Sequence, residues 1–268
     1  MKQHMKQQMI AVFASLLTVA GLGGIARAGV VIDEQVTTTQ GGGPPVVHTR
    51  ELMVQGHKEK MVSERNMFVI DLDKGTMMLV DPNQKAYAEM PFPPRGMSNS
   101  SGQQLDLNFQ KTGKSSKVLD YSCEEYSGAG KTAMAAISTS GCFSTSAPGA
   151  GEFTEFTEAM GLKLKNARAM AGKMPSGIPL TMDSKRTMNA GFSMPGMAPD
   201  QAARFKEMMA KQGPQTTRTV VTKIAARDLP ADTFEAPAGY VRRGMNAPSA
   251  PMPGGAGAGA APSKKVPE

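Results

Sequence analysis

Two short stretches of the chain carry the Gly-Lys-Ser/Thr triplet that binds phosphate in nucleotide-binding loops. They are Gly130-Lys131-Thr132 and Gly113-Lys114-Ser115. The full motif requires a glycine five positions before the glycine of the triplet, because the loop backbone wraps closely around the phosphate. Glu125 and Asn108 stand at those positions, and a carboxylate there would repel phosphate. We therefore interpret both triplets as turns and expect no nucleotide partner.

Hydrolytic or metal-dependent chemistry needs histidine, cysteine and acidic residues at defined spacings. After residue 28 the histidines are His48 and His57, both in polar surroundings. The chain has no Gly-x-Ser-x-Gly motif and no zinc-type spacing of His, Cys, Asp and Glu. The adjacent Glu124 and Glu125 would point to opposite faces of a strand. We predict a non-enzymatic protein without a cofactor.

Methionine is the outlier in composition, with 22 residues. Thioether sulfur is a soft ligand that selects Cu(I), and Met188, Met194 and Met197 lie in a segment rich in Gly and Pro. Because neither His nor Cys lies near them in sequence, Cu(I) binding ranks third among the hypotheses for function.

Another stretch has apolar residues at spacings of three and four, the pattern of one face of an amphipathic helix. Gly172 and Pro175 are expected to end this helix, and Ala167 lies on the same face. Since methionine adapts to varied apolar ligands, the face could line a groove for an apolar or lipidic ligand. The alternative for each residue is ordinary core packing against a sheet. The candidate ligand-binding residues are Phe153, Phe156, Met160, Leu164, Met170 and Met174.

The elements that must position this helix are mostly strands, separated by turns about ten residues apart, which is typical of an antiparallel meander. The expected strands are 30–38, 46–54, 58–63, 67–72, 76–80, 85–90, 118–126, 131–140, 178–187 and 217–226, with 234–240 closing the domain. Residues 91–115 are expected to form a loop, and residues 127–130 a hairpin turn. A shorter helix is expected from Pro199-Asp200 to Gly213-Pro214, with Phe205, Met208 and Met209 on or near its apolar face. This order favours a curved antiparallel sheet with helices packed across one face.

The N-terminus has the parts of a secretory signal. A positively charged start precedes an uncharged apolar run over residues 9–22, and Ala26-Arg27-Ala28 is a small-x-small cleavage pattern. The run has 14 residues, fewer than the about 20 that cross a bilayer as a helix. We therefore favour cleavage between Ala28 and Gly29 over a retained membrane anchor, and expect a periplasmic or secreted protein.

The rest of the sequence divides into a domain at residues 29–243 and a tail at residues 244–268. The tail is rich in Ala, Gly and Pro and too poor in large apolar residues to order, so we expect it to be disordered. Because Lys2, Lys6 and Arg27 lie in the signal, its removal lowers the formal net charge from +7 to +4. The remaining basic residues are spread along the chain, so we expect no nucleic-acid partner.

Cys123 and Cys142 are the two cysteines of the chain. In an oxidising compartment an even pair favours a disulfide. Closing a loop of that length would stabilise the fold by about 3 kcal/mol. Two free thiols are the alternative.

The stretch from Met67 to Glu89 resembles the core hairpin of a bacterial family of secreted proteins of unknown function, grouped by structure with the LolA/LolB-type lipoprotein carriers. Cys123 in a strand, Gly177-Ile-Pro-Leu180 after the helix, and the ending Phe234-Glu-Ala-Pro-Ala-Gly-Tyr240 also fit. The likeness covers roughly residues 30–243. It implies an α+β fold in which a curved, unclosed antiparallel sheet, shaped like half a barrel, carries one long and one short helix across its concave face. In the carriers, such a fold encloses an apolar cavity for acyl chains.

Three hypotheses for function follow. The first is an exported, non-enzymatic, carrier-like protein that binds an apolar or lipidic ligand between sheet and helix. The second is a structural or interaction module with a filled core, which uses its tail as a tether and binds a protein of the cell envelope. The third is Cu(I) binding by methionine. An apolar cavity beneath the helix, large enough for an acyl chain, would favour the first over the second.

Overall fold

The computed structural model describes residues 28–64, 66–94, 107–131, 135–164, 174–189, 200–201, 203–204, 207–208 and 213–244. Within these residues, twelve strands form one sheet in the order β12-β6-β5-β4-β3-β2-β1-β11-β10-β9-β8-β7. The strands are β1 (Gly29–Gln40), β2 (Val46–Gln55), β3 (Lys58–Ser63), β4 (Met67–Asp71), β5 (Thr76–Asp81), β6 (Ala86–Pro91), β7 (Asn108–Val118), β8 (Tyr121–Lys131), β9 (Ala135–Ser144), β10 (Ile178–Met188), β11 (Gln215–Arg227) and β12 (Val241–Arg242).

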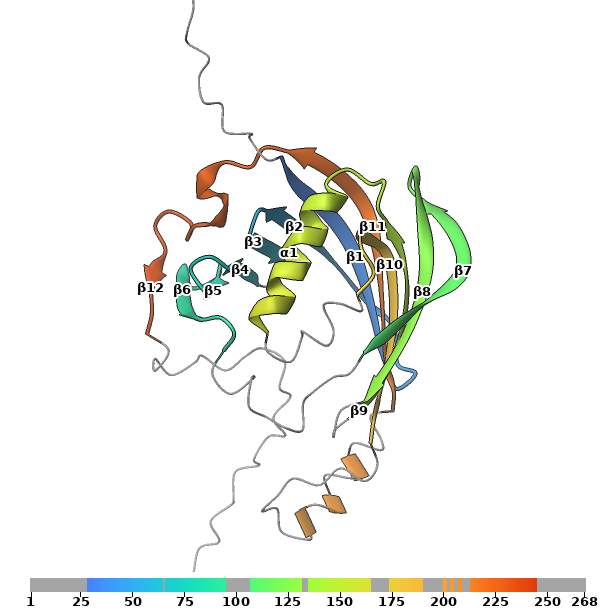
Figure 1. The fold of residues 1–268 in the computed structure, drawn as a ribbon. Coiled ribbons are helices and arrows are strands. Elements are labelled where there is room, and N and C mark those ends of the chain that lie inside the picture. The colour runs from blue at the N-terminus through green and yellow to red at the C-terminus, as the bar shows by residue number, and fades with distance from the viewer. Residues whose placement is uncertain are drawn as a thin grey trace, which may run out of the picture.

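The sheet is antiparallel except where β12 runs parallel to β6. The strand order ends at β12 on one side and at β7 on the other, so the described sheet is not closed. The sheet is also curved (Figure 1). This confirms the predicted half-barrel. An α-helix, α1 (Ala150–Lys163), lies across the concave side, and a short 3-10 helix, η1 (Ala231–Phe234), precedes β12.

Short turns with local hydrogen bonds produce the meander from β1 to β6. The Asp71 carboxylate accepts a hydrogen bond from the backbone N–H of Lys74 at 2.9 Å, and Gly75 closes that turn with a φ of 64°. Asp81 accepts in the same way from the N–H of Asn83. Such Asp side chains imitate a backbone turn, and glycine adopts positive φ without a steric penalty. The hairpins predicted around these turns are confirmed.

The core lies between α1 and the concave face. Phe156 of α1 is 0% exposed and belongs to the same buried cluster as Val30 of β1 and Val54 of β2. The carboxylate of Glu152 accepts a hydrogen bond from the backbone N–H of Gly56, which ties the first turn of α1 to the β2–β3 turn. Apolar contact and this bond together fix α1 on β1 and β2.

The segment before β8 differs from the prediction. β7 begins at Asn108, within the expected loop, and forms an additional hairpin with β8 through a turn at Leu119-Asp120. The predicted hairpin of 118–126 and 131–140 corresponds to the pair β8 and β9, but residues 127–130 belong to β8 and form no turn. Leu119 has a φ of 52°, a conformation that favours glycine or asparagine, so the sequence carries no turn signal there.

Gly113 (φ 81°) lies at a bulge within β7, and Gly130-Lys131 ends β8. The interpretation of both Gly-Lys-Ser/Thr triplets as turns was therefore wrong, because their described residues lie in strands. Thr132, the last residue of the Gly130 triplet, falls outside the described residues.

The helix is also shorter than predicted over its described part. α1 begins three residues before Phe153 and ends at Lys163, since Leu164 has an extended backbone with ψ 101°. Gly161, in the last turn, weakens helix formation because glycine loses more backbone entropy than other residues. Met174 lies outside any helix, whereas Ala167, Met170 and Gly172 fall outside the described residues.

The second predicted helix is described only in part. Residues 200–201, 203–204 and 207–208 are helical and exposed. Figure 1 places them beyond the end of β10, away from α1, and not across the concave face as predicted. Phe205 and Met209 lie outside the described residues, as do residues 1–27 and 245–268, which contain nearly all of the predicted signal and tail.

Candidate functional site

The concave face carries a continuous row of apolar side chains from β11 to β6. Directly paired residues on neighbouring strands point to the same face. Within the row, Ile32 is 1% exposed in the core, whereas Leu79 is 44% exposed. The row therefore runs from the core under α1 to an open apolar surface. Its members are Ile224, Ile32, Leu52, Met61, Phe68, Leu79 and Ala88. We call the four residues Leu52, Met61, Phe68 and Leu79 the apolar wall.

A second row lies beside the first and contains one acidic residue. Glu59 of β3 pairs with Val54 on one side and Ile70 on the other. The row continues through Met77 and Met90. A carboxyl group is thereby placed between buried aliphatic side chains, next to the apolar wall.

Two charged side chains from β1 and β2 act electrostatically on Glu59. The Arg50 Nε donates a hydrogen bond to Glu34, whose carboxylate is almost fully buried. Burial raises the pKa of Glu59 from 4.5 to about 7, opposed by the positive charge of Arg50 and reinforced by the negative charge of Glu34. Glu59 is therefore neutral at mildly acidic pH and adds a negative charge to the concave face above neutrality.

The predicted ligand-binding residues are only partly brought together. Phe153 and Met160 are half-buried against the core, and Phe156 is part of it. Leu164 is half-buried at the end of α1, whereas Met174 is 39% exposed and Met170 is outside the described residues. A cavity of about 450 Å³ beside α1 is lined by Thr154 and Glu158, among others, and by none of these apolar residues.

The other predicted sites are scattered. Met188 ends β10, while Met194 and Met197 lie outside the described residues, so Cu(I) binding stays a prediction. His57 lies in the β2–β3 turn, with its Nδ1 at 2.7 Å from Asp73 Oδ1, and both side chains are largely exposed. His48 is in β2, opposite Val36.

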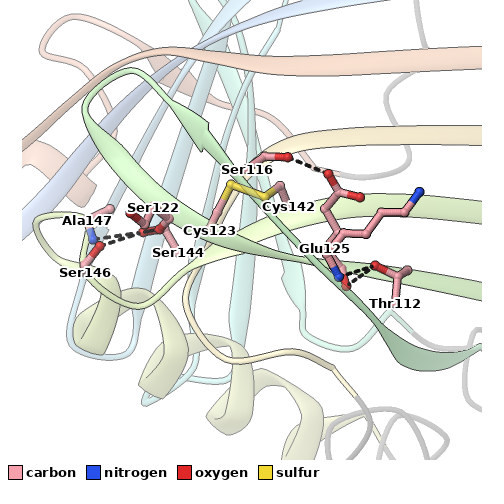
Figure 2. Close-up of a disulfide and its surroundings, with 10 residues drawn as sticks. Thr112, Ser116, Ser122, Cys123, Glu125, Cys142, Ser144, Ser146 and Ala147 are labelled. Atoms are coloured by element: carbon pink, nitrogen blue, oxygen red, sulfur yellow. Dashed lines mark hydrogen bonds between the residues drawn. A yellow bond between two sulfur atoms is a disulfide. The ribbon is translucent and has the colours of Figure 1, made fainter.

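The disulfide between Cys123 and Cys142 is present and joins β8 to β9 (Figure 2). Its Cα atoms are 5.3 Å apart, and both residues are buried. Next to it, Ser144 donates a hydrogen bond to the carbonyl of Ser122 at 2.7 Å and accepts one from the N–H of Ala147. The end of β9 and the start of the α1 segment are thereby fixed. A structural disulfide is typical of an exported protein.

Sequence reasoning missed the apolar wall and the effect of Arg50 and Glu34 on the charge of Glu59. Alternation within β3 could have placed Glu59 and Met61 on one face. The cross-strand neighbours of Glu59 depend on how β2, β3 and β4 are aligned with one another. The positions of the turns between these strands set that register.

Residues 49–144 match the family model described as a domain of unknown function (DUF4412). The predicted resemblance to a family of unknown function is confirmed over this part. No curated protein matches the chain significantly.

The solved structures that the chain matches share little sequence with it. An uncharacterised conserved protein from Thermus thermophilus is 8% identical, covers 80% of this chain and 90% of its own, and has a TM-score of 0.35. A LolA superfamily protein from Nitrosomonas europaea is 8% identical, with coverages of 78% and 90% and a TM-score of 0.29. PNGF-II is 8% identical with a TM-score of 0.36; the match covers 81% of this chain but spans only 31% of the length of PNGF-II.

Within the described part of the chain, no helix combines the length and apolar character needed to span a membrane.

Proposed function

We propose that this chain is an exported binding protein that holds an apolar ligand, such as an acyl chain, between α1 and the apolar wall. The observation that carries the proposal is the row through Leu52, Met61, Phe68 and Leu79. It continues the core without a polar break and ends in a side chain that is 44% exposed. A contiguous exposed apolar surface is typical of a binding site.

The helix provides the opposite side of the proposed site. Phe153 and Met160 pack against the same core as Phe68 and Leu52, so both walls are apolar. The first half of α1 is tied down by Glu152 and by the Thr154 hydroxyl, which accepts a hydrogen bond from the N–H of Gly177 at 2.8 Å. Methionine at Met160 and Met61 suits a site that adjusts to chains of different shape.

The test is the binding of a fluorescent long-chain fatty acid to delipidated protein. We expect saturable binding, and we expect Leu79→Asp to weaken it at least about tenfold, since a charge in an apolar contact costs more than about 1.4 kcal/mol. Met78→Asp is the matched control, because Met78 is the neighbouring residue of β5 and faces the other side of the sheet. Equal thermal stability of the two variants shows that folding is not the cause.

Phe156→Asp is not a suitable probe, because Phe156 is fully buried and a charge there would unfold the domain. If wild-type protein takes up no probe, the binding proposal is wrong. A filled interaction module that binds a protein of the cell envelope would then be favoured.

A further inference from the structure

A groove of about 920 Å³ crosses six strands, from β1 through β11, β10, β9 and β8 to β7. Thr37 and Thr39 of β1 line it. The lining contains none of the four residues of the apolar wall.

Two complete cross-strand rows form its floor. The register places twelve side chains in these rows, and all but Ala129 are polar. The first row is Thr37, Arg218, Asp183, Ser140, Ser127 and Gln110, and the second is Thr39, Thr216, Lys185, Ser138, Ala129 and Asn108.

The chemistry of this floor is nearly neutral hydrogen bonding. Six of the residues are serine or threonine and two are side-chain amides, so most groups can both donate and accept. Arg218 and Asp183 form an ion pair at 3.3 Å and offset each other, which leaves Lys185 as the additional charge on the floor. A nucleic acid would require several cations along the groove, and an acyl chain would require an apolar lining.

The spacing of the rows fits an extended polyhydroxylated chain. Neighbouring strands lie about 4.8 Å apart, so six strands present polar groups over about 24 Å at a nearly constant interval. That interval is close to the length of one sugar unit in an extended β-linked chain, and each unit carries several hydroxyl groups. We propose that this groove binds an extended, uncharged polysaccharide.

The experiment uses the full chain and a panel of soluble β-1,4-linked glucose and N-acetylglucosamine oligomers, with binding measured by calorimetry. We expect at least one oligomer to bind, and longer oligomers to bind more tightly until the six strands are spanned. Ser138→Val combined with Ser140→Val should weaken binding about thirtyfold, because two hydrogen bonds worth about 2 kcal/mol together are lost. Both serines are exposed and in the middle of the groove, and valine favours strands, so the fold should persist.

Thr38→Val is the matched control, because Thr38 lies between Thr37 and Thr39 but faces the other side of β1; its affinity should equal that of wild type. The affinity should also change by less than about twofold between low and high salt, since neutral recognition is not screened. No binding by any oligomer overturns the proposal. It is equally overturned if the serine variant binds like wild type, or if a single-stranded DNA or peptide probe binds in place of the sugars.

Discussion

The raised pKa of Glu59 predicts how Glu59→Gln changes the pH dependence of stability. In the folded protein this pKa is about 7, compared with 4.5 for an ordinary glutamate. At pH values between 4.5 and 7, Glu59 is mostly protonated in the folded state and mostly ionised in the unfolded state. The folded state therefore binds more protons than the unfolded state in this range. Stability contributed by this group is therefore complete below about pH 4.5 and lost as the pH rises through about 7. Glutamine cannot ionise, so the variant lacks this loss.

The magnitude follows from the two pKa values. At 1.36 kcal/mol per pH unit, the full difference corresponds to about 3 kcal/mol. Glu59 is only half-buried by surface area, so screening by solvent reduces the effect, and we expect about 1 to 2 kcal/mol. Relative to wild type, Glu59→Gln should therefore gain this amount of stability between pH 5 and pH 8.

The assay is urea unfolding of both proteins at several pH values between 5 and 8, because other groups that titrate in this range cancel in the difference. Gln55→Glu provides a control for altered charge at the end of the same β2–β3 hairpin, where the added carboxyl is not flanked by Val54 and Ile70. Its difference from wild type should be flat with pH. A flat difference for Glu59→Gln, or one that shrinks toward pH 8, would refute the reasoning about the buried carboxyl.

Three further predictions concern stability. Replacing Cys123 and Cys142 by alanine should lower the free energy of unfolding by about 3 kcal/mol, measured in urea, and reducing agent should then have no further effect; an unchanged value would contradict a structural role. Phe156→Ala should cost about 3 to 5 kcal/mol in the same assay, since it leaves a cavity in the core, and a loss under 1 kcal/mol would show that α1 does not pack as described. Gly149→Ala should cost at least about 1 kcal/mol, because Gly149 has a φ of 77° and the new Cβ would lie 2.4 Å from Val30 Cβ. Gly151→Ala, with open space around it, should be neutral or stabilising in thermal unfolding, and equal losses for both glycines would contradict this argument.

The strands of the first meander could be predicted because alternation and turn chemistry agree there. Lys58–Ser63 was predicted with the observed bounds, since Gly56 and Asn66 flank it. The β7–β8 hairpin could not be predicted, because its turn uses Leu119 at positive φ and its strands are rich in residues typical of loops. Their pairing comes from backbone hydrogen bonds that composition does not reveal.

The start of α1 was missed for a similar local reason. Gly149 precedes the helix without a side chain that caps it, so the usual Ser, Thr, Asp or Asn signal is absent. The predicted stripe located Phe153, Phe156 and Met160 correctly on the side that meets the core. The opposite side of the proposed site needed the register of β2 to β5. The polar groove combines β1 and β11, which are far apart in the chain.

The open ends of the sheet bear on how this protein behaves at high concentration. The outer edge of β7 carries Lys111, Lys114 and Lys117 and is interrupted by a bulge between Lys111 and Ser115. At the other end, β12 has only two residues. Lysines, bulges and short edge strands all discourage a second chain from adding to a sheet. A half-barrel with two free edges is thereby protected from end-to-end polymerisation while its concave side stays accessible.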